Sequence, residues 1–321
     1  MKSPLTKGEK MEKIKIFSGR SNKGLAEEIC RRLNIKLSPK EPREYANGCF
    51  EAILQEEVKD CKVFLIQTSI PQTLHHDLWE LLQMVNAAKE NGASEIIVVM
   101  PYVSYARSDK IYASGMAIAA KLLVKLLKAS GMTRFIGIDF HSKKFEKFLS
   151  ELDVRGYHLS ALPLFIEYLK TKYIGDGVVM SSDEGALDKT VLLAKKLGLP
   201  VGVARKKRID DKTVIIEDIV GEVSGKDVII FDDEISPAAT TLRTLAKELK
   251  KRGAKSIVVA VTHASITGDT IRSLQKLNMI RELIVTDTVP IPEEARRLLP
   301  LQVLSVAGLI AEKIKEISKE P

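Results

Sequence analysis

Two adjacent carboxylates, Asp232 and Asp233, are the residues best placed to do chemistry, because they directly follow the apolar run at residues 228–231. Small and hydroxyl side chains follow from Ser236, and a helical pattern begins at about Thr241. In an open α/β sheet, ligands bind at the carboxyl ends of the strands, where a helix N-terminus can face a phosphate. This arrangement suits a sugar phosphate, with the carboxylates at the sugar hydroxyls. A capped turn with acids near a helix start is the alternative that these residues alone leave open.

Imidazole and basic side chains supply further candidates. His141 follows the apolar run at residues 135–138, where it could serve a ligand or be a histidine that is satisfied at the end of a strand. The cluster at residues 206–208, two lysines and an arginine, is by itself typical of a solvated surface. Neither feature identifies a reaction without the elements that would position it.

The scaffold is predicted from short β-branched runs that alternate with longer amphipathic stretches, a pattern typical of a mostly parallel sheet with helices. In the first half, these runs lie at residues 14–17, 63–66, 96–100 and 135–138. The pattern then restarts, with runs at residues 178–180, 201–204, 228–231, 257–261 and 283–285. The sequence therefore predicts two α/β domains.

A helix-to-strand phrase at residues 91–96 returns in similar form at residues 252–257, which also favours a duplicated unit. The segment 158–163 is expected to open the first helix of the second half. The predicted divisions are a loose lysine-rich tail at 1–12, an N-terminal domain at 13–155 and a C-terminal domain at 156–321.

Composition limits the class of protein. A chain of 321 residues with 45% apolar and 29% charged residues has enough material for two buried cores. The formal charge is +8, but lysine and arginine alternate with glutamate and aromatics make up only 5%, so no nucleic-acid partner is expected. No apolar run approaches the roughly 20 residues that span a bilayer, and the N-terminus lacks a signal-peptide core. We therefore expect a cytoplasmic protein without a membrane partner.

Cysteine and histidine spacing gives no metal or disulfide signal. Cys30, Cys49 and Cys61 show neither CxxC nor CxxH spacing. The neighbouring pair His75 and His76 would diverge on a helix, which makes a joint metal site unexpected.

The strand, the paired aspartates and the loop that ends in Thr240 resemble the phosphoribosyl-binding motif of phosphoribosyltransferases and of phosphoribosyl pyrophosphate synthetases. Further phrases follow the order and spacing of the synthetases, at residues 16–19, 101–109, 139–141, 262–268 and 285–290. From about residue 14 to residue 314, the chain thus resembles the ribose-phosphate diphosphokinase family. The resemblance implies an α/β fold of two phosphoribosyltransferase-like domains, each a mostly parallel sheet flanked by helices. It also implies an active site between the domains, completed by a neighbouring subunit of a homo-oligomer, either a dimer or a hexamer.

The activity implied by the resemblance is transfer of the pyrophosphoryl group of ATP to ribose 5-phosphate, with Mg²⁺, to give phosphoribosyl pyrophosphate and AMP. The implied catalytic residues are Lys206 and Arg208, and the implied metal-associated residues are His141 and Asp183. The implied ATP-binding residues are Tyr45, Asn47, Cys49, Arg107, Ser108, Asp109 and His141. The implied sugar-phosphate residues are Asp232, Asp233, Ser236, Ala238, Ala239, Thr240 and Thr241.

Positions on the ATP side depart from the family pattern. Asn47 and Cys49 stand where the family has carboxylates, and Cys49 is expected to be a small buried residue. Ser108 replaces a glutamine. In the loop at residues 110–117 only Lys110 is cationic, whereas family members carry several cations that stabilise the transferring phosphates.

The phosphate loop departs as well. Pro237 has no N–H to offer a phosphate, and Ala239 stands where the family has a flexible glycine. The N–H groups of Ala238, Ala239 and Thr240 are still expected to cradle an anion.

Three functions remain open from the sequence. The first is an active diphosphokinase with unusual loops, and the second is a weak or inactive paralogue that assembles with or regulates an active synthetase. The third is a diphosphokinase that acts on another phosphorylated sugar. The retained charges favour the first, since clustered charges are costly to keep without a ligand.

Overall fold

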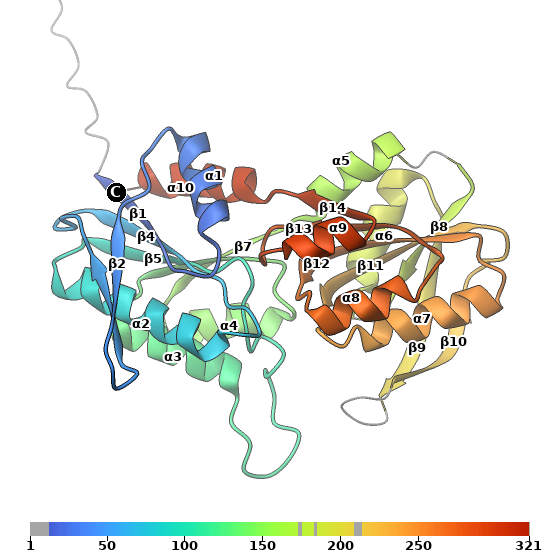
Figure 1. The fold of residues 1–321 in the computed structure, drawn as a ribbon, viewed down its shortest axis with the longest axis horizontal. Coiled ribbons are helices and arrows are strands. Elements are labelled where there is room, and N and C mark those ends of the chain that lie inside the picture. Colours follow the sequence, from blue (N-terminus) through green and yellow to red (C-terminus); the bar gives the residue numbers. More distant parts are fainter. Residues whose placement is uncertain (1–12, 173–174, 183–184, 209–213, 321) are drawn as a thin grey trace, which may run out of the picture.

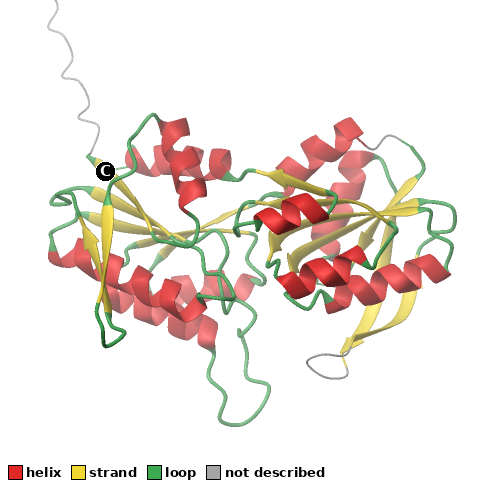
Figure 2. Ribbon diagram, viewed as in Figure 1, coloured by secondary structure: helices red, strands yellow, loops and turns green. Residues whose placement is uncertain are grey.

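The computed structural model describes residues 13–172, 175–182, 185–208 and 214–320 of the chain. The expected tail at 1–12, the candidate metal residue Asp183 and the side chain of Arg208 lie outside the described part. Two α/β domains lie side by side, each with a sheet between layers of helices (Figure 1, Figure 2). In the described part of the chain, no helix is long and apolar enough to cross a membrane.

The N-terminal domain has a five-stranded, wholly parallel sheet in the order β1-β4-β5-β6-β7. Its strands are β1 (Ile14–Ser18), β4 (Lys62–Ile66), β5 (Glu95–Val99), β6 (Arg134–Ile138) and β7 (Arg155–Leu159). One face packs on α2 (Leu74–Glu90), α3 (Ala119–Ser130) and α4 (Lys143–Glu151), and the other on α1 (Lys23–Leu33). A separate antiparallel hairpin, β2 (Lys40–Glu44) and β3 (Phe50–Leu54), stands beside α2 (Figure 1).

The C-terminal domain has a seven-stranded sheet in the order β10-β9-β8-β11-β12-β13-β14, parallel except for the β9–β10 pair. Its strands are β8 (Gly177–Ser181), β9 (Val201–Arg208), β10 (Val214–Val220), β11 (Asp227–Ile235), β12 (Ser256–Ala264), β13 (Ile280–Thr286) and β14 (Leu301–Leu304). Its helices are α5 (Leu162–Lys172), α6 (Leu187–Leu197), α7 (Thr240–Lys251), α8 (Gly268–Gln275) and α9 (Glu293–Leu298). Helices α5 and α6 cover one face of this sheet, and α7, α8 and α9 cover the other.

The two domains share one continuous apolar core, which runs from Ile16 and Phe64 in the first sheet to Phe165 and Phe231 in the second. The last helix, α10 (Ala307–Ser318), leaves the second domain and packs against α1 (Figure 1). Lys62 Nζ donates to the carbonyl of Ile317 at 3.2 Å, which ties the end of α10 to the first sheet. The C-terminal domain is therefore connected to the N-terminal domain at both of its chain ends.

The sheets do not divide where the sequence pattern placed the boundary. Residues 155–159 form β7 of the first sheet, and α5 begins at Leu162, inside the segment 158–163 that was expected to open a helix. The physical reason is that β7 is an edge strand with mostly exposed, polar residues and shows no apolar run. Helix α10 likewise lies with the first domain, although its residues were assigned to the second.

Candidate active site

A cavity of about 340 Å³ opens at the carboxyl end of β11, between that strand and the start of α7. Lys206, Asp232, Asp233 and His141 line it, together with Arg107. These side chains come from both domains. The cavity also takes in all of the predicted phosphate loop, namely Ser236, Pro237, Ala238, Ala239, Thr240 and Thr241.

The paired aspartates stand on β11, which lies inside its sheet between β8 and β12. Burial, and next the negative charge of Asp233, raise the pKa of Asp232 to about 8. Burial alone would also raise the pKa of Asp233, but the hydrogen bond from His141 holds that pKa well below its usual range. At neutral pH, the pair thus retains a proton on Asp232 that an incoming cation would displace.

His141 reaches this pair from the other domain. Its Nδ1 lies 2.6 Å from Asp233 Oδ2, and that contact raises the pKa of His141. The ring is therefore charged over a wider pH range than a free histidine, and it pairs with the Asp233 carboxylate.

The turn that carries His141 is fixed by Asp139, a buried residue with a left-handed φ of 41°. Its carboxylate accepts hydrogen bonds from Thr262 Oγ1 at 2.8 Å and from Lys189 Nζ at 2.9 Å. Burial would raise the pKa of Asp139, but the charge of Lys189 keeps it lowered, so the ion pair persists at neutral pH. The second domain thus holds in place the turn on which His141 stands.

Arg107 is brought to the same cavity but is already paired. Its Nε lies 3.3 Å from Glu234 Oε2, and Tyr102 Oη donates to Glu234 Oε1, also at 3.3 Å. Sequence reasoning did not select Glu234, although it directly follows the two aspartates and continues their strand. The third acid in the run at residues 232–234 was the available signal.

The phosphate loop differs from expectation in one respect. Ala239 adopts a left-handed conformation with φ 47°, and its N–H donates to the carbonyl of Ser236 at 2.9 Å. That N–H is engaged within the loop, so the expected cradle from three successive N–H groups was wrong at this position. Helix α7 begins directly afterwards at Thr240, and its N-terminus faces the cavity.

Known proteins resemble this chain over most of its length. The sequence profile of the N-terminal domain of ribose phosphate pyrophosphokinase matches residues 14–131, and that of the phosphoribosyl synthetase-associated domain matches residues 178–321. A ribose-phosphate pyrophosphokinase of Synechococcus elongatus is 35% identical, over 96% of this chain and 92% of its own length. One of Gloeobacter violaceus is 34% identical, over 96% of this chain and 91% of its own. The crystal structure of phosphoribosylpyrophosphate synthetase from Mycobacterium smegmatis superposes with a TM-score of 0.87 at 30% identity, covering 95% of this chain and 99% of the other.

The chain belongs to the ribose-phosphate pyrophosphokinase family. The predicted family and the α/β fold of two domains with mostly parallel, helix-flanked sheets are confirmed.

The hairpin turn that this family resemblance assigned to the base of ATP lies apart from the cavity. Tyr45 Oη donates to Glu51 at 2.8 Å, and Asn47 Oδ1 accepts the N–H of Cys49 at 3.0 Å. Cys49 is exposed, so its expected burial was wrong. The reason is that the turn projects beyond α2, where it meets no core (Figure 1).

Ser108 and Asp109 also lie outside the cavity lining, within the described part of the chain. Ser108 Oγ accepts the N–H of Ala119 at 3.3 Å, at the start of α3. Asp109 Oδ2 accepts a hydrogen bond from the hydroxyl of Ser142 at 2.7 Å and lies 3.6 Å from Lys144 Nζ. Both side chains thus anchor the base of the loop at residues 110–117.

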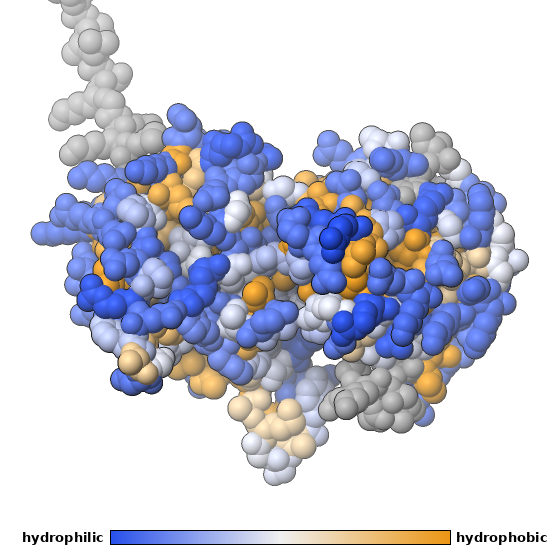
Figure 3. Space-filling view, in the orientation of Figure 1, coloured by the Kyte–Doolittle hydropathy of each residue, from blue (hydrophilic) through white to orange (hydrophobic). Residues whose placement is uncertain are grey.

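That loop protrudes from the molecule with an apolar tip (Figure 3). Ile111 is 60% and Tyr112 is 64% exposed, and Lys110 Nζ lies 5.1 Å from the Tyr112 ring centre. Lys110 is the one cationic residue at positions 110–117, so the loop offers a phosphate little positive charge.

Proposed function

We propose that this protein is a ribose-phosphate diphosphokinase, which transfers the pyrophosphoryl group of ATP to the anomeric hydroxyl of ribose 5-phosphate. The observation that carries the proposal is the cavity in which Asp232, Asp233 and Lys206 lie beside the N-terminus of α7. A strand end with carboxylates next to a helix N-terminus suits a sugar phosphate. The names of the relatives support the same activity.

The sugar is assigned to the C-terminal domain. Its 5-phosphate is placed at the loop 236–240, where the hydroxyls of Thr240 and Thr241 and the first turn of α7 favour an anion. The carboxylate of Asp232 is placed at the ribose hydroxyls, which donate to it once its proton has left.

In the reaction, the anomeric oxygen forms a bond to the β-phosphorus of ATP. The bond from that phosphorus to the oxygen that bridges the α- and β-phosphates breaks, and AMP leaves with its electron pair. The hydroxyl proton passes to solvent. Lys206 is placed to offset the charge that develops, a role worth about 10²–10³ in rate for one such group. Arg208 is proposed from the resemblance to offset the same charge, and Asp183 is proposed from the resemblance as a Mg²⁺-associated residue.

The donor set fits Mg²⁺, which takes oxygen ligands, keeps several waters and commonly binds one or two carboxylates together with substrate phosphates. Asp232 and Asp233 supply such oxygens, and the raised pKa of Asp232 means that the nearby cations do not fully offset the pair. Bound there, Mg²⁺ would neutralise charge on the transferring phosphates. Because Nδ1 of His141 is directed at Asp233, we assign His141 to orient that carboxylate and contact the nucleotide phosphates.

The nucleotide is assigned to the side of the cavity formed by Arg107 and His141. The turn at residues 45–49 is proposed to contact the base of ATP held by a neighbouring subunit, since none of its residues lines the cavity of its own chain. This assignment requires a homo-oligomer, a dimer or a hexamer. A cytoplasmic location and the absence of a nucleic-acid partner stay predictions from the sequence.

The second candidate function is that of a weak paralogue that assembles with an active synthetase. The exposed apolar residues Ile111 and Tyr112 favour it, because a loop of this composition stabilises a triphosphate poorly and suits contact with another protein.

Release of AMP from ATP, with Mg²⁺ and ribose 5-phosphate, separates the two functions. We expect sugar-dependent AMP from the wild type and a loss of about 10²–10³ in Lys206→Ala. Lys207→Ala is the matched control, because Lys207 is the exposed neighbour on the other face of β9. No AMP above background from folded wild type would reject the diphosphokinase, and restoration of activity by an added synthetase subunit would favour the paralogue. Replacing ribose 5-phosphate with other pentose phosphates tests the alternative sugar.

A further inference from the structure

The β2–β3 hairpin has little core of its own. Its two strands pair only with each other among the described strands, and most of its residues are exposed. A two-stranded hairpin is marginally stable in water without packing against another element. Contacts with the rest of the domain must therefore set the direction in which the turn at residues 45–49 points.

Helix α2 contacts β3 through two hydrogen bonds and one pair of stacked rings. Gln83 accepts the N–H of Ala52 and donates to the carbonyl of Phe50, both at 2.9 Å, so it continues the hairpin's hydrogen bonding into the helix. The His76 ring stacks on the Phe50 ring with centres 4.0 Å apart. These contacts hold one strand of the hairpin against α2.

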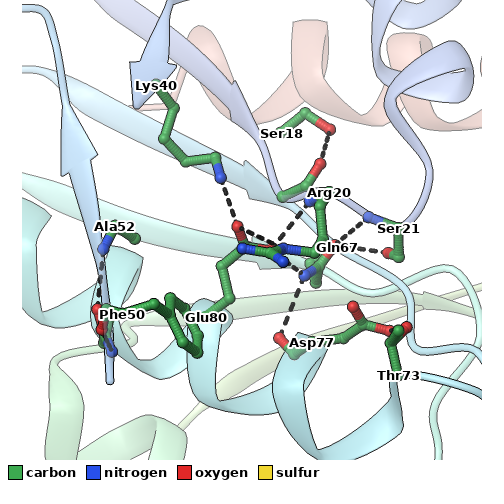
Figure 4. A network of polar contacts seen from close by, with 12 residues as sticks. Ser18, Arg20, Ser21, Lys40, Phe50, Ala52, Gln67, Thr73, Asp77 and Glu80 are labelled. Carbon is green, nitrogen blue, oxygen red and sulfur yellow. Dashed lines mark hydrogen bonds and ion pairs between the residues drawn. The ribbon is translucent and has the colours of Figure 1, made fainter. Parts of the chain in front are cut away.

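The other strand is held by charge. Glu80 of α2 is completely buried, and its carboxylate accepts from Lys40 Nζ of β2 at 2.5 Å (Figure 4). The backbone N–H of Arg20 donates to the same carboxylate at 2.9 Å, and Arg20 Nε lies 3.5 Å from it. Gln67, at the end of β4, adds a hydrogen bond at 2.8 Å. Four groups from three segments thus meet on one buried carboxylate.

Arg20, which is bound to Glu80, also contacts the hairpin directly. Its guanidinium lies 5.3 Å from the centre of the Phe50 ring, and it approaches Glu44 at 3.4 Å. Phe50 and Glu44 are the two residues that flank the turn. Glu80 therefore acts through Arg20 on both residues that flank the turn, and through Lys40 on the start of β2.

The charge state of Glu80 suits this role. Burial would raise its pKa, but the hydrogen bond from Lys40 and the neighbouring Arg20 keep the pKa below the usual range. The group is therefore a carboxylate at neutral pH, and its removal would leave the nearly buried ammonium of Lys40 without its partner.

We propose that Glu80 is a positioning residue, which fixes the orientation of the β2–β3 hairpin and so of the turn at residues 45–49. The inference rests on the proposed function for its link to ATP, because that function assigns the turn to the base of the nucleotide. The structural part of the inference, a clamp formed by the contacts of Glu80 with Lys40 and Arg20, does not depend on the proposed function. The chemistry that the turn would meet is a purine base with its ribose.

The test compares Glu80→Gln with Glu90→Gln, an exposed residue on the same helix that undergoes the same chemical change. In Glu80→Gln, amide hydrogen exchange in residues 40–54 should rise about tenfold or more. The KM for ATP should rise about tenfold, while kcat and the KM for ribose 5-phosphate stay within about twofold. Glu90→Gln should match the wild type in every measurement.

A charge rescue separates positioning from a general loss of structure. The double variant Lys40→Met, Glu80→Gln removes the unpaired ammonium, so hairpin exchange and the KM for ATP should return part of the way to the wild type. If Glu80→Gln does not fold, Lys40→Met alone is used, since it leaves Glu80 with Arg20 and Gln67 and should show the same changes in smaller measure.

Unchanged hairpin exchange in these variants overturns the proposal. So does a rise in hairpin exchange with no change in the KM for ATP, because the turn then has no part in nucleotide binding. If the wild type forms no AMP, the proposed function fails, and hairpin exchange still decides whether Glu80 is a clamp.

Discussion

Two carboxylates at equivalent edges of the two sheets meet opposite surroundings. Glu80 lies at the carboxyl ends of β1 and β4 in the first domain, and Asp232 lies at the carboxyl end of β11 in the second. Glu80 is fully surrounded by donors from Lys40, Arg20 and Gln67, and its pKa is lowered. Asp232 borders a cavity beside a second carboxylate, and its pKa is raised to about 8.

The difference shows how a structural carboxylate is told apart from one that awaits a ligand. The charge of Glu80 is balanced by side chains of the same protein, so this carboxylate stabilises the position of the β2–β3 hairpin. Asp232 borders open space and a second carboxylate, so its charged form is favoured only when a cation or a polyhydroxyl ligand binds there and displaces its proton. The carboxyl ends of the strands therefore hold a structural carboxylate in the first domain and a ligand-binding carboxylate in the second.

The largest effect is expected from Asp232→Asn, which removes the carboxyl group that borders the cavity. Sugar-dependent AMP formation should fall about 10³-fold in kcat/KM, because both the sugar contact and the cation site are weakened. Asp227→Asn, at the opposite end of the same strand, is the matched control and should stay close to the wild type. Equal losses in both variants would mean that the effect comes from the strand and not from the site.

For the carboxylate that is already paired, Glu80→Gln should lower the free energy of unfolding by about 3 kcal/mol, because a buried ion pair loses one partner. The only tryptophan of the chain, Trp79, precedes Glu80 on α2 and is 56% exposed, so its fluorescence reports on this helix during urea unfolding. Glu90→Gln should change the value by less than about 0.5 kcal/mol. If Glu80→Gln also changed the free energy of unfolding by less than about 0.5 kcal/mol, the contacts of Glu80 with Lys40 and Arg20 would contribute no stability.

A pH dependence follows from the raised pKa of Asp232. An unfolded aspartate loses its proton near pH 4, whereas folded Asp232 keeps it to about pH 8, so the folded state binds more protons between those values. Its stabilising contribution is therefore complete below pH ~4 and is lost as the pH rises toward 8. Between pH 6 and pH 8, the unfolding free energy should fall by about 2 kcal/mol more in the wild type than in Asp232→Asn. Parallel curves for the two proteins in metal-free buffer would contradict the assigned titration.

The smallest effect is expected at Ala239, whose left-handed conformation costs about 1–2 kcal/mol for an alanine. Ala239→Gly removes that strain but adds chain entropy to the unfolded state, so a net gain of about 0.5 kcal/mol is expected. Ala238→Gly, one residue earlier and not in that region, should instead lose about 0.5 kcal/mol. Thermal unfolding of both variants gives the sign, and a loss in Ala239→Gly would mean that the alanine is not strained.

Much of the fold could be predicted from the sequence, because most strands of both sheets are buried on both faces and appear as continuous apolar runs. Strand β7 was missed because it is an exposed edge strand without such a run. The duplicated helix-to-strand phrase did locate β5 and β12 in equivalent positions.

The site was predictable where a single segment carries it, as in Asp232, Asp233 and the loop that follows them. Pairings between distant segments were not, since nothing in the sequence brings Glu234 to Arg107 or Glu80 to Lys40. The N–H of Ala239 was misjudged because its bond to Ser236 depends on a backbone conformation that alanine rarely adopts.

The central claim is that the cavity at the end of β11 transfers a pyrophosphoryl group, and ³¹P NMR of the products tests it most directly. Wild-type protein with ATP, Mg²⁺ and ribose 5-phosphate should give the signals of AMP and of a pyrophosphate ester on the sugar, at equal rates. Formation of ADP and a sugar bisphosphate would contradict the account by showing transfer of a single phosphoryl group, and unchanged ATP would contradict it by showing no transfer at all.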